Sequence, residues 1–103
     1  MLLQDILDHG ERAAEHMGAR SKVEYRADWL RRDAVERCLI VVGEALNQAR
    51  QQWPDLTGRI TSAQRIVDFR NIMVHGYAMI EPEVVWDIVR VHLPILLAEA
   101  RTL

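Results

Sequence analysis

The chain has 103 residues, of which 50% are apolar and 27% are charged, and this ordinary globular composition excludes a disordered protein. Its length predicts a single domain over residues 1–103. A formal net charge of −2 excludes a strongly basic nucleic-acid-binding chain, and the lone cysteine, Cys38, excludes an intrachain disulfide.

The first predicted helix covers about residues 2–17. Gly18 follows it as a natural stop, because glycine readily adopts the left-handed conformation that ends a helix. The segment after Gly18 is short and rich in arginine, and it either helps to bind RNA or is simply solvated. The apolar residues that recur at helical spacing are Leu3, Ile6, Leu7, Ala13, Ala14 and Met17.

The longest predicted helix begins near Asp28 and ends near Gln52, before Pro54. Gly43 lies within it, and the small residues Gly43 and Ala45 would allow another helix to approach closely. Cys38 lies on the apolar stripe, which indicates a buried thiol and not a catalytic one. The stripe consists of Ala34, Cys38, Val41, Val42, Ala45, Leu46 and Ala49.

The third predicted helix follows a turn over residues 53–58, where an extra short helical turn is expected near residues 55–60. Thr61 and Gln64 fit a capping box at the start of this helix. We expect the helix to stop at Gly76. Its inward-facing residues are Ile66, Phe69 and Met73.

The fourth predicted helix opens at Pro82, which is favoured in a first turn, and Pro94 should kink it. It is apolar over much of its circumference, so we expect one face in the core and another against a second subunit. The sequence shows no strand alternation. These elements together predict an all-α antiparallel bundle of four main helices.

The chain carries neither a signal-peptide pattern at its N-terminus nor an apolar stretch of the ~18 residues that a membrane span requires. We therefore expect a cytoplasmic protein that does not associate with membranes. No set of cysteine, histidine or carboxylate residues has metal-ligand spacing, and there is no glycine-rich phosphate loop. We therefore expect neither a metal nor a cofactor.

The segment from Arg70 to Tyr77 concentrates residues suited to phosphate chemistry. Arginine is a permanent cation whose planar donors match phosphate oxygens. Histidine transfers protons near neutral pH, so His75 is a candidate base or acid. Cleavage of RNA by its own 2′-hydroxyl group needs a base, an acid and a cation that stabilises the phosphorane. Arginine and histidine supply these without a metal.

The spacing of Arg70 and His75 constrains how they act together. On an ideal helix they would lie about 140° apart, whereas Asn71 and His75 would share a face. Arg70 and His75 converge only if the helix unwinds near His75, which Gly76 would permit, or if two chains assemble one site. A two-fold dimer would place two arginines and two histidines in one cleft.

A purely structural interpretation of the same residues stays open. Arg70 would then pair with Asp68 or Glu44, and His75 would bond the carbonyl groups at a helix end. Tyr77 would be a packing aromatic. We assign no role to the remaining histidines, which are His9, His16 and His92.

The segment Arg70-Asn71-Ile72-Met73-Val74-His75-Gly76-Tyr77 resembles the R-x4-H-x-Y signature of HepT-like toxins in the HEPN superfamily. Three further segments resemble that family in the same order. They are Val42-Gly43-Glu44-Ala45, Trp53-Pro54, and Glu83-Val84-Val85-Trp86-Asp87 with Leu93-Pro94. The resemblance covers most of the chain, and the first helix is the least diagnostic part.

The resemblance implies a dimerising HEPN-type bundle and a metal-independent endoribonuclease with Arg70 and His75 as the catalytic pair. It implies supporting roles for Asn71 and Glu44. It also implies the toxin of a type VII-like toxin–antitoxin system, whose partner is a minimal nucleotidyltransferase (MNT). That partner would transfer AMP from ATP to Tyr77, and the added phosphate would repel RNA beside Arg70 and His75.

HEPN proteins also include members that cut no RNA. The alternative is therefore a catalytically silent binding module that docks a nucleotidyltransferase or a nucleotide. The presence of Arg70 and His75 favours the enzyme.

Overall fold

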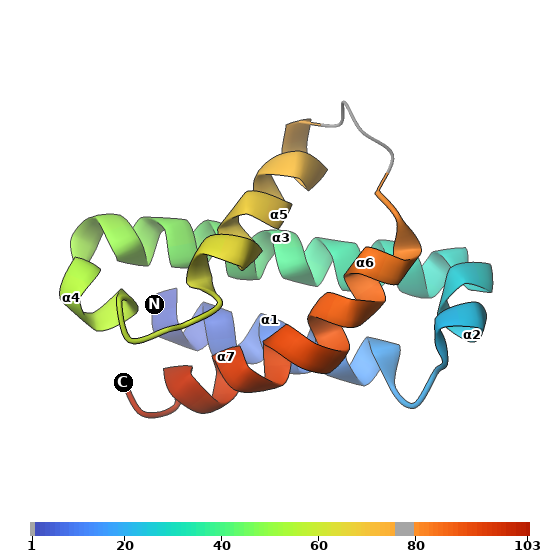
Figure 1. The fold of residues 1–103 in the computed structure, drawn as a ribbon, viewed down its shortest axis with the longest axis horizontal. Helices are drawn as coiled ribbons and strands as arrows, with labels where there is room; N and C mark the ends of the chain where they lie inside the picture. The colour runs from blue at the N-terminus through green and yellow to red at the C-terminus, as the bar shows by residue number, and fades with distance from the viewer. Residues whose placement is uncertain (1, 76–79) are drawn as a thin grey trace.

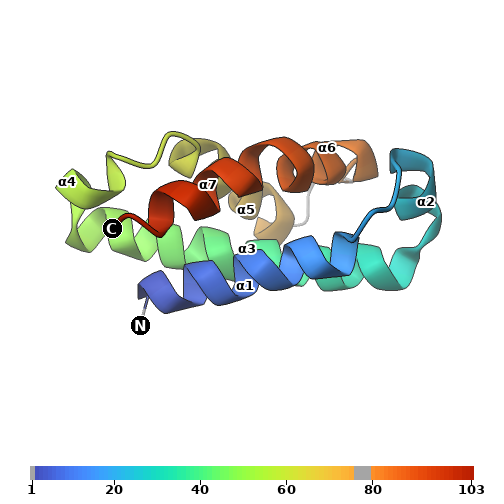
Figure 2. The ribbon, with the colours of Figure 1, turned by 90° about the horizontal axis from the view of Figure 1, so that it is seen from below.

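The computed structural model describes residues 2–75 and 80–103, which form an all-α bundle with no strand among them (Figure 1). The long helices α1 and α3 run antiparallel in one layer, and the later helices cover that layer (Figure 2). The predicted all-α bundle is confirmed. The elements are α1 (Leu2–Met17), α2 (Lys22–Ala27), α3 (Trp29–Gln52), α4 (Pro54–Thr57), α5 (Ala63–His75), α6 (Pro82–Asp87), the π-helix η1 (Ile88–His92) and α7 (Leu93–Ala100).

Helices α1 and α3 have the predicted bounds because local signals end and begin them. Gly18 has a φ of +56°, in the left-handed region, and its N–H donates to the carbonyl of Ala14 at 2.9 Å. Asp28 caps α3 by accepting a hydrogen bond from the N–H of Arg31 at 3.2 Å. The predicted limits of both helices are therefore confirmed.

Helix α2 is a short element that the sequence pattern did not predict. Ser21 and Glu24 form a capping box in which each side chain accepts a hydrogen bond from the other residue's N–H, at 3.2 and 3.0 Å. Tyr25 anchors the helix because its side chain is completely buried.

Three cations of the arginine-rich segment, and Arg31 in the first turn of α3, lie next to carboxylates, which favours its interpretation as a solvated, ion-paired surface. The pairs are Arg20 and Arg31 with Asp28, Lys22 with Asp87, and Arg26 with Glu83.

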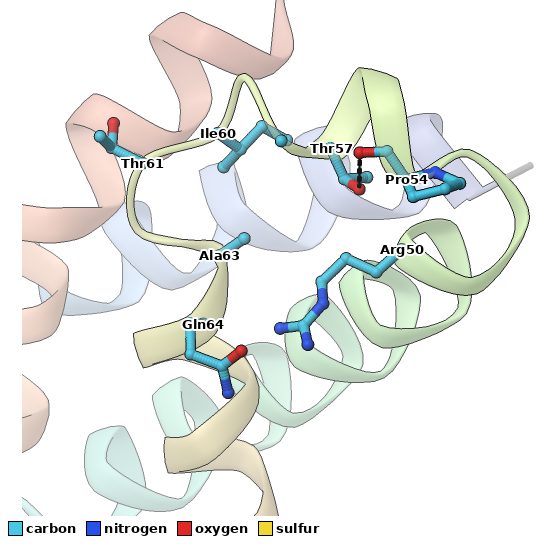
Figure 3. Close-up of a pocket in the computed structure, with 8 residues that line it drawn as sticks. Arg50, Pro54, Thr57, Ile60, Thr61, Ala63 and Gln64 are labelled. Carbon is cyan, nitrogen blue, oxygen red and sulfur yellow. Dashed lines mark hydrogen bonds between the residues drawn. The ribbon is translucent and has the colours of Figure 1, made fainter.

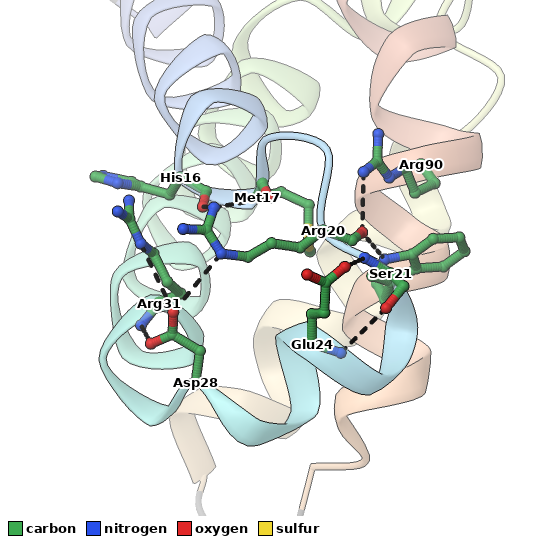
Figure 4. A network of polar contacts seen from close by, with 9 residues as sticks. His16, Met17, Arg20, Ser21, Glu24, Asp28, Arg31 and Arg90 are labelled. Carbon is green, nitrogen blue, oxygen red and sulfur yellow. Dashed lines mark hydrogen bonds and ion pairs between the residues drawn. The ribbon is translucent and has the colours of Figure 1, made fainter.

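Trp86 of α6 and Arg90 of η1 form hydrogen bonds with the turn between α1 and α2 (Figure 4). The indole N–H of Trp86 donates to the carbonyl of Arg20 at 2.9 Å. The Nη2 atom of Arg90 donates to the carbonyls of Gly18 and Arg20, at 2.6 and 3.0 Å. The guanidinium of Arg90 also lies over the Trp86 ring, 5.4 Å from its centroid. These contacts satisfy the carbonyl groups of Gly18 and Arg20 in the turn that follows α1.

A π-helix, η1, lies just before Pro94, where the sequence predicted a kink. Proline lacks an N–H, and its ring would crowd the carbonyl of Arg90 in a regular α-helix. The N–H of Leu93 instead bonds the carbonyl of Ile88, five residues earlier, which widens the turn just before Pro94. Pro82 opens α6 as predicted.

The region between α3 and α5 differs partly from the prediction. The extra turn expected near residues 55–60 is the short helix α4. The predicted capping box is wrong, because the N–H and hydroxyl of Thr61 donate to the carboxylate of Glu99, at 3.2 and 2.6 Å. The side chain of Gln64 donates to Asp68 at 2.6 Å.

One apolar core joins the helices. Each fully buried leucine or isoleucine stabilises the fold by about 1.5–3 kcal/mol relative to an exposed one. None of the helices in the described part of the chain is long and apolar enough to span a membrane. The largest aliphatic core residues are Ile6, Met17, Leu39, Leu46, Ile66, Leu93 and Leu96.

Candidate active site

Helix α5 carries Arg70, Asn71 and His75 and packs against α3 (Figure 1). Its apolar face points into the core through Ile66 and Phe69, both of which are buried. Arg70 follows Ile66 by four residues and therefore lies on the face turned toward α3. Its side chain is 19% exposed, so the guanidinium is largely enclosed.

The guanidinium of Arg70 is held by two of the predicted supporting residues. Its Nη2 atom donates to the Oε2 atom of Glu44 on α3, and the two side chains form an ion pair. Its Nη1 atom donates to the Oδ1 atom of Asn71 at 2.6 Å. The structure therefore brings Arg70, Glu44 and Asn71 together. Of the two acids considered for Arg70, Glu44 is the partner.

Glu44 is well suited to hold a cation at neutral pH. Its pKa is lowered, first by a hydrogen bond that Gln48 donates at 3.2 Å and then by Arg70, while partial burial acts in the opposite direction. The side chain of Glu44 is 43% exposed, so its negative charge is partly screened by solvent. The ion pair therefore fixes the orientation of Arg70 but contributes little to the free energy of folding.

Arg70 keeps donors beyond those that Glu44 and Asn71 use. A guanidinium has five N–H donors. The Nε atom of Arg70 is buried and has no hydrogen-bond partner within residues 2–75 and 80–103. Each Nη atom carries a second N–H besides the one bonded to Glu44 or Asn71. Two N–H groups directed by fixed neighbours suit the recognition of a phosphate.

His75 lies at the end of α5, and its side chain is exposed. The helix is regular from Ala63 through His75. Arg70 and His75 are therefore about 140° apart around the helix and do not share a face. Of the two ways to bring them together, unwinding at His75 is absent from the described residues. Gly76 and Tyr77, the predicted stop and the predicted point of modification, lie outside those residues.

His9 and the cysteine have surroundings that account for them without catalysis. The Nδ1 atom of His9 lies 3.1 Å from the carbonyl oxygen of Asp5, one turn earlier on α1. Cys38 is 7% exposed, and burial raises the pKa of its thiol, so the prediction of a buried thiol is confirmed. No group of three or more His, Cys, Asp or Glu side chains in the described ranges is placed to hold a metal ion.

A cavity of about 280 Å³ that the sequence did not indicate lies between the end of α3, α4 and the start of α5 (Figure 3). The side chains of Arg50 and Gln64 extend toward each other at its edge. Both belong to segments whose pattern predicted only a helix end and a cap. Arg50 lies six residues after Glu44 on α3, and Gln64 lies six before Arg70 on α5.

A family model described as "HepT-like: Ribonuclease HepT-like" matches residues 6–103. The match includes every segment that resembled the family, and also most of α1. No curated protein and no solved structure matches the chain.

Proposed function

The chain belongs to the HepT-like ribonuclease family, and from this membership we propose that it is a metal-independent endoribonuclease with Arg70 and His75 as catalytic residues. The observation that carries the proposal is the placement of Arg70. Within the described residues, Glu44 and Asn71 hold its guanidinium and leave the second N–H of each Nη atom to bind a phosphate. A structural ion pair alone would not require a third side chain on the guanidinium.

The reaction would use groups that RNA and this chain already contain. His75 removes the proton of a 2′-hydroxyl group, and the resulting oxygen attacks the adjacent phosphorus. Arg70 stabilises the negative charge of the phosphorane. The bond to the 5′-oxygen then breaks, and this oxygen takes a proton from a second histidine or from water. The products are a 2′,3′-cyclic phosphate and a free 5′-hydroxyl group.

We test the activity with purified protein and RNA in excess EDTA. Arg70→Ala and His75→Ala should each lower the cleavage rate by roughly 100-fold or more. Arg12→Ala, an exposed arginine on α1, is the control and should stay near the wild-type rate. If wild type and both variants show the same background cutting, the protein is a silent module that docks a nucleotidyltransferase or a nucleotide.

The proposed site is shared by two copies of the chain. A regular α5 separates Arg70 from His75, and a second copy would supply the missing side chain. Apolar surface suited to such a contact lies next to the motif. Ile72 on α5 and Val84 on α6 are 49% and 45% exposed and line one groove.

The shared site is tested by the oligomeric state. Ile72→Asp should give monomers in light scattering and should lose RNA cleavage. Val23→Asp alters an even more exposed residue, on α2, and should leave the dimer intact. A wild-type monomer that cleaves RNA would contradict the two-chain arrangement.

We also propose that the protein is the toxin of a toxin–antitoxin pair and that a nucleotidyltransferase partner neutralises it by adding AMP to Tyr77. The chain has two tyrosines, and Tyr25 is completely buried, so tyrosine modification of the folded protein falls on Tyr77. The adenylyl phosphate would lie two residues from His75 and repel RNA. Co-expression with the partner should add the mass of adenylyl groups to the wild type and none to Tyr77→Phe. An unchanged shift in that variant would place the modification elsewhere.

A further inference from the structure

Helices α3 and α5 lie in close contact where Gly43 faces Arg70. A methyl group on the Cα of Gly43 would lie 2.4 Å from the Cβ of Arg70 and 2.8 Å from its Cγ. It would also lie 3.3 Å from the carbonyl oxygen of Ile66. The Cβ of Arg70 is fixed to the backbone of α5, so no rotation of the side chain relieves this overlap. Only glycine fits at position 43 with the two helices where they are.

The contact lies directly beside the ion pair. The first carbons of the Arg70 side chain rest on Gly43, and its guanidinium bonds Glu44, the next residue of α3. From this geometry we infer that Gly43 is a positioning residue for Arg70. The missing Cβ sets the distance between the helices at which the guanidinium reaches Glu44 and Asn71 together. The catalytic consequence of this inference rests on the proposed function.

Gly10 shows that a buried, closely packed glycine in a helix does not always fix the distance between two helices. A methyl group there would lie 2.6 Å from Cδ2 of Leu97, the flexible end of a side chain. Rotation of Leu97 would relieve the overlap without moving α1 or α7. Gly10 and Gly43 are both buried in long helices against another helix, and only the second contacts Arg70.

The size of the overlap gives the size of the expected effect. Ordinary contacts begin at 3.4 Å, so an alanine at position 43 requires a movement of about 1 Å between α3 and Arg70. A displacement of that size costs roughly 100-fold in rate when the displaced group stabilises a transition state. The contacts that bind the rest of the RNA would change less than the contact with Arg70. The loss of rate should therefore appear in kcat and not in KM.

The experiment compares Gly43→Ala with Gly10→Ala. We expect Gly43→Ala to lower kcat for RNA cleavage by about 10- to 100-fold with little change in KM, and Gly10→Ala to keep both constants within about twofold. The NMR resonance of the Arg70 Nε–H, assigned by its loss in Arg70→Lys, should shift in Gly43→Ala and stay in place in Gly10→Ala. This measurement needs no activity, so it decides the inference even if the wild-type protein cuts no RNA.

A second variant covers the case in which Gly43→Ala does not fold. The double variant Gly43→Ala/Arg70→Gly places a Cβ on α3 and removes the facing Cβ from α5, so it should restore folding. Arg70→Gly alone carries the same new glycine in α5 and the same lost ion pair, so it is the control. A double variant that stays unfolded while Arg70→Gly folds would overturn the inference, because the overlap would then not be with Arg70. An unchanged Nε–H resonance and an unchanged kcat in a folded Gly43→Ala would overturn it as well.

Discussion

Glu44 and Arg70 join α3 to α5 through an ion pair whose two members differ in exposure, 43% for the acid and 19% for the base. The cation is thus enclosed, whereas the anion faces solvent. Removal of Glu44 would leave the enclosed guanidinium of Arg70 without its anionic partner. Removal of Arg70 would leave the carboxylate of Glu44, which water can solvate. The two deletions are therefore not equivalent.

The first prediction concerns the strength of this pair. A double-mutant cycle with Glu44→Ala and Arg70→Ala should give a coupling free energy of about 0.5–1 kcal/mol at pH 7, measured by urea unfolding. Because the pKa of Glu44 is lowered in the folded protein, the coupling is present above the ordinary glutamate value of 4.5. It is lost as the pH falls through the lower folded value. A coupling that vanishes already above pH 4.5 would contradict the prediction.

The second prediction concerns a carboxyl group whose pKa moves the other way. Burial raises the pKa of Glu36 above 4.5; Arg32 opposes this shift and Asp33 adds to it. Glu36 therefore favours the folded state below its unfolded pKa and loses that contribution as the pH rises through the folded value. Glu36→Gln should be more stable than wild type at pH 7, and the difference in Tm should shrink toward pH 4. Glu15→Gln removes an exposed charge and controls for net charge.

The third prediction concerns the contact of Arg90 with the turn between α1 and α2. Arg90→Ala removes two hydrogen bonds to carbonyls and the contact with the Trp86 ring. We expect a loss of about 1–2 kcal/mol in the free energy of unfolding. Arg37→Ala, an exposed arginine on α3, should change stability by less than about 0.5 kcal/mol. Equal effects of the two substitutions would show that the contact contributes nothing.

The fourth prediction concerns Cys38. Its thiol is almost inaccessible and burial raises its pKa, so little reactive thiolate reaches solvent. A chromogenic disulfide reagent should therefore react slowly with native protein at pH 8 and stoichiometrically in 8 M-range denaturant, at about the rate of a free thiol. A fast reaction of one thiol per chain under native conditions would mean that the α3 stripe opens readily.

The helices that could be predicted are those whose ends are marked locally. Gly18 and Asp28 lie at their helix ends and act through neighbours in the chain, so the limits of α1 and α3 followed from the sequence. Helix α2 was missed although Ser21 and Glu24 carry the same kind of signal, because arginines dominate that segment. The capping box of Thr61 failed since Glu99, 38 residues later, accepts its hydrogen bonds.

In the candidate site too, the features set by local sequence could be predicted and those set by distant residues could not. The helix that carries Arg70 and His75, and the angle between them, followed from spacing alone. The choice of Glu44 over Asp68 as the partner of Arg70 depends on where α5 crosses α3, which no local pattern specifies. Likewise, the sequence indicated that Gly43 and Ala45 would permit a close helix, but not that Arg70 would be the residue packed on Gly43. The catalytic roles, the dimer and the single domain stay predictions.

The contacts of Trp86 and Arg90 with the turn after α1 join residues that are 66 and 72 positions apart in the chain. The N-terminus of a chain leaves the ribosome first, so α1 and α3 emerge long before Trp86 and Arg90. Contacts of such long range also close late in folding, because the entropy of a large loop must be overcome first. The bundle is therefore completed only after Trp86 and Arg90 have emerged from the ribosome.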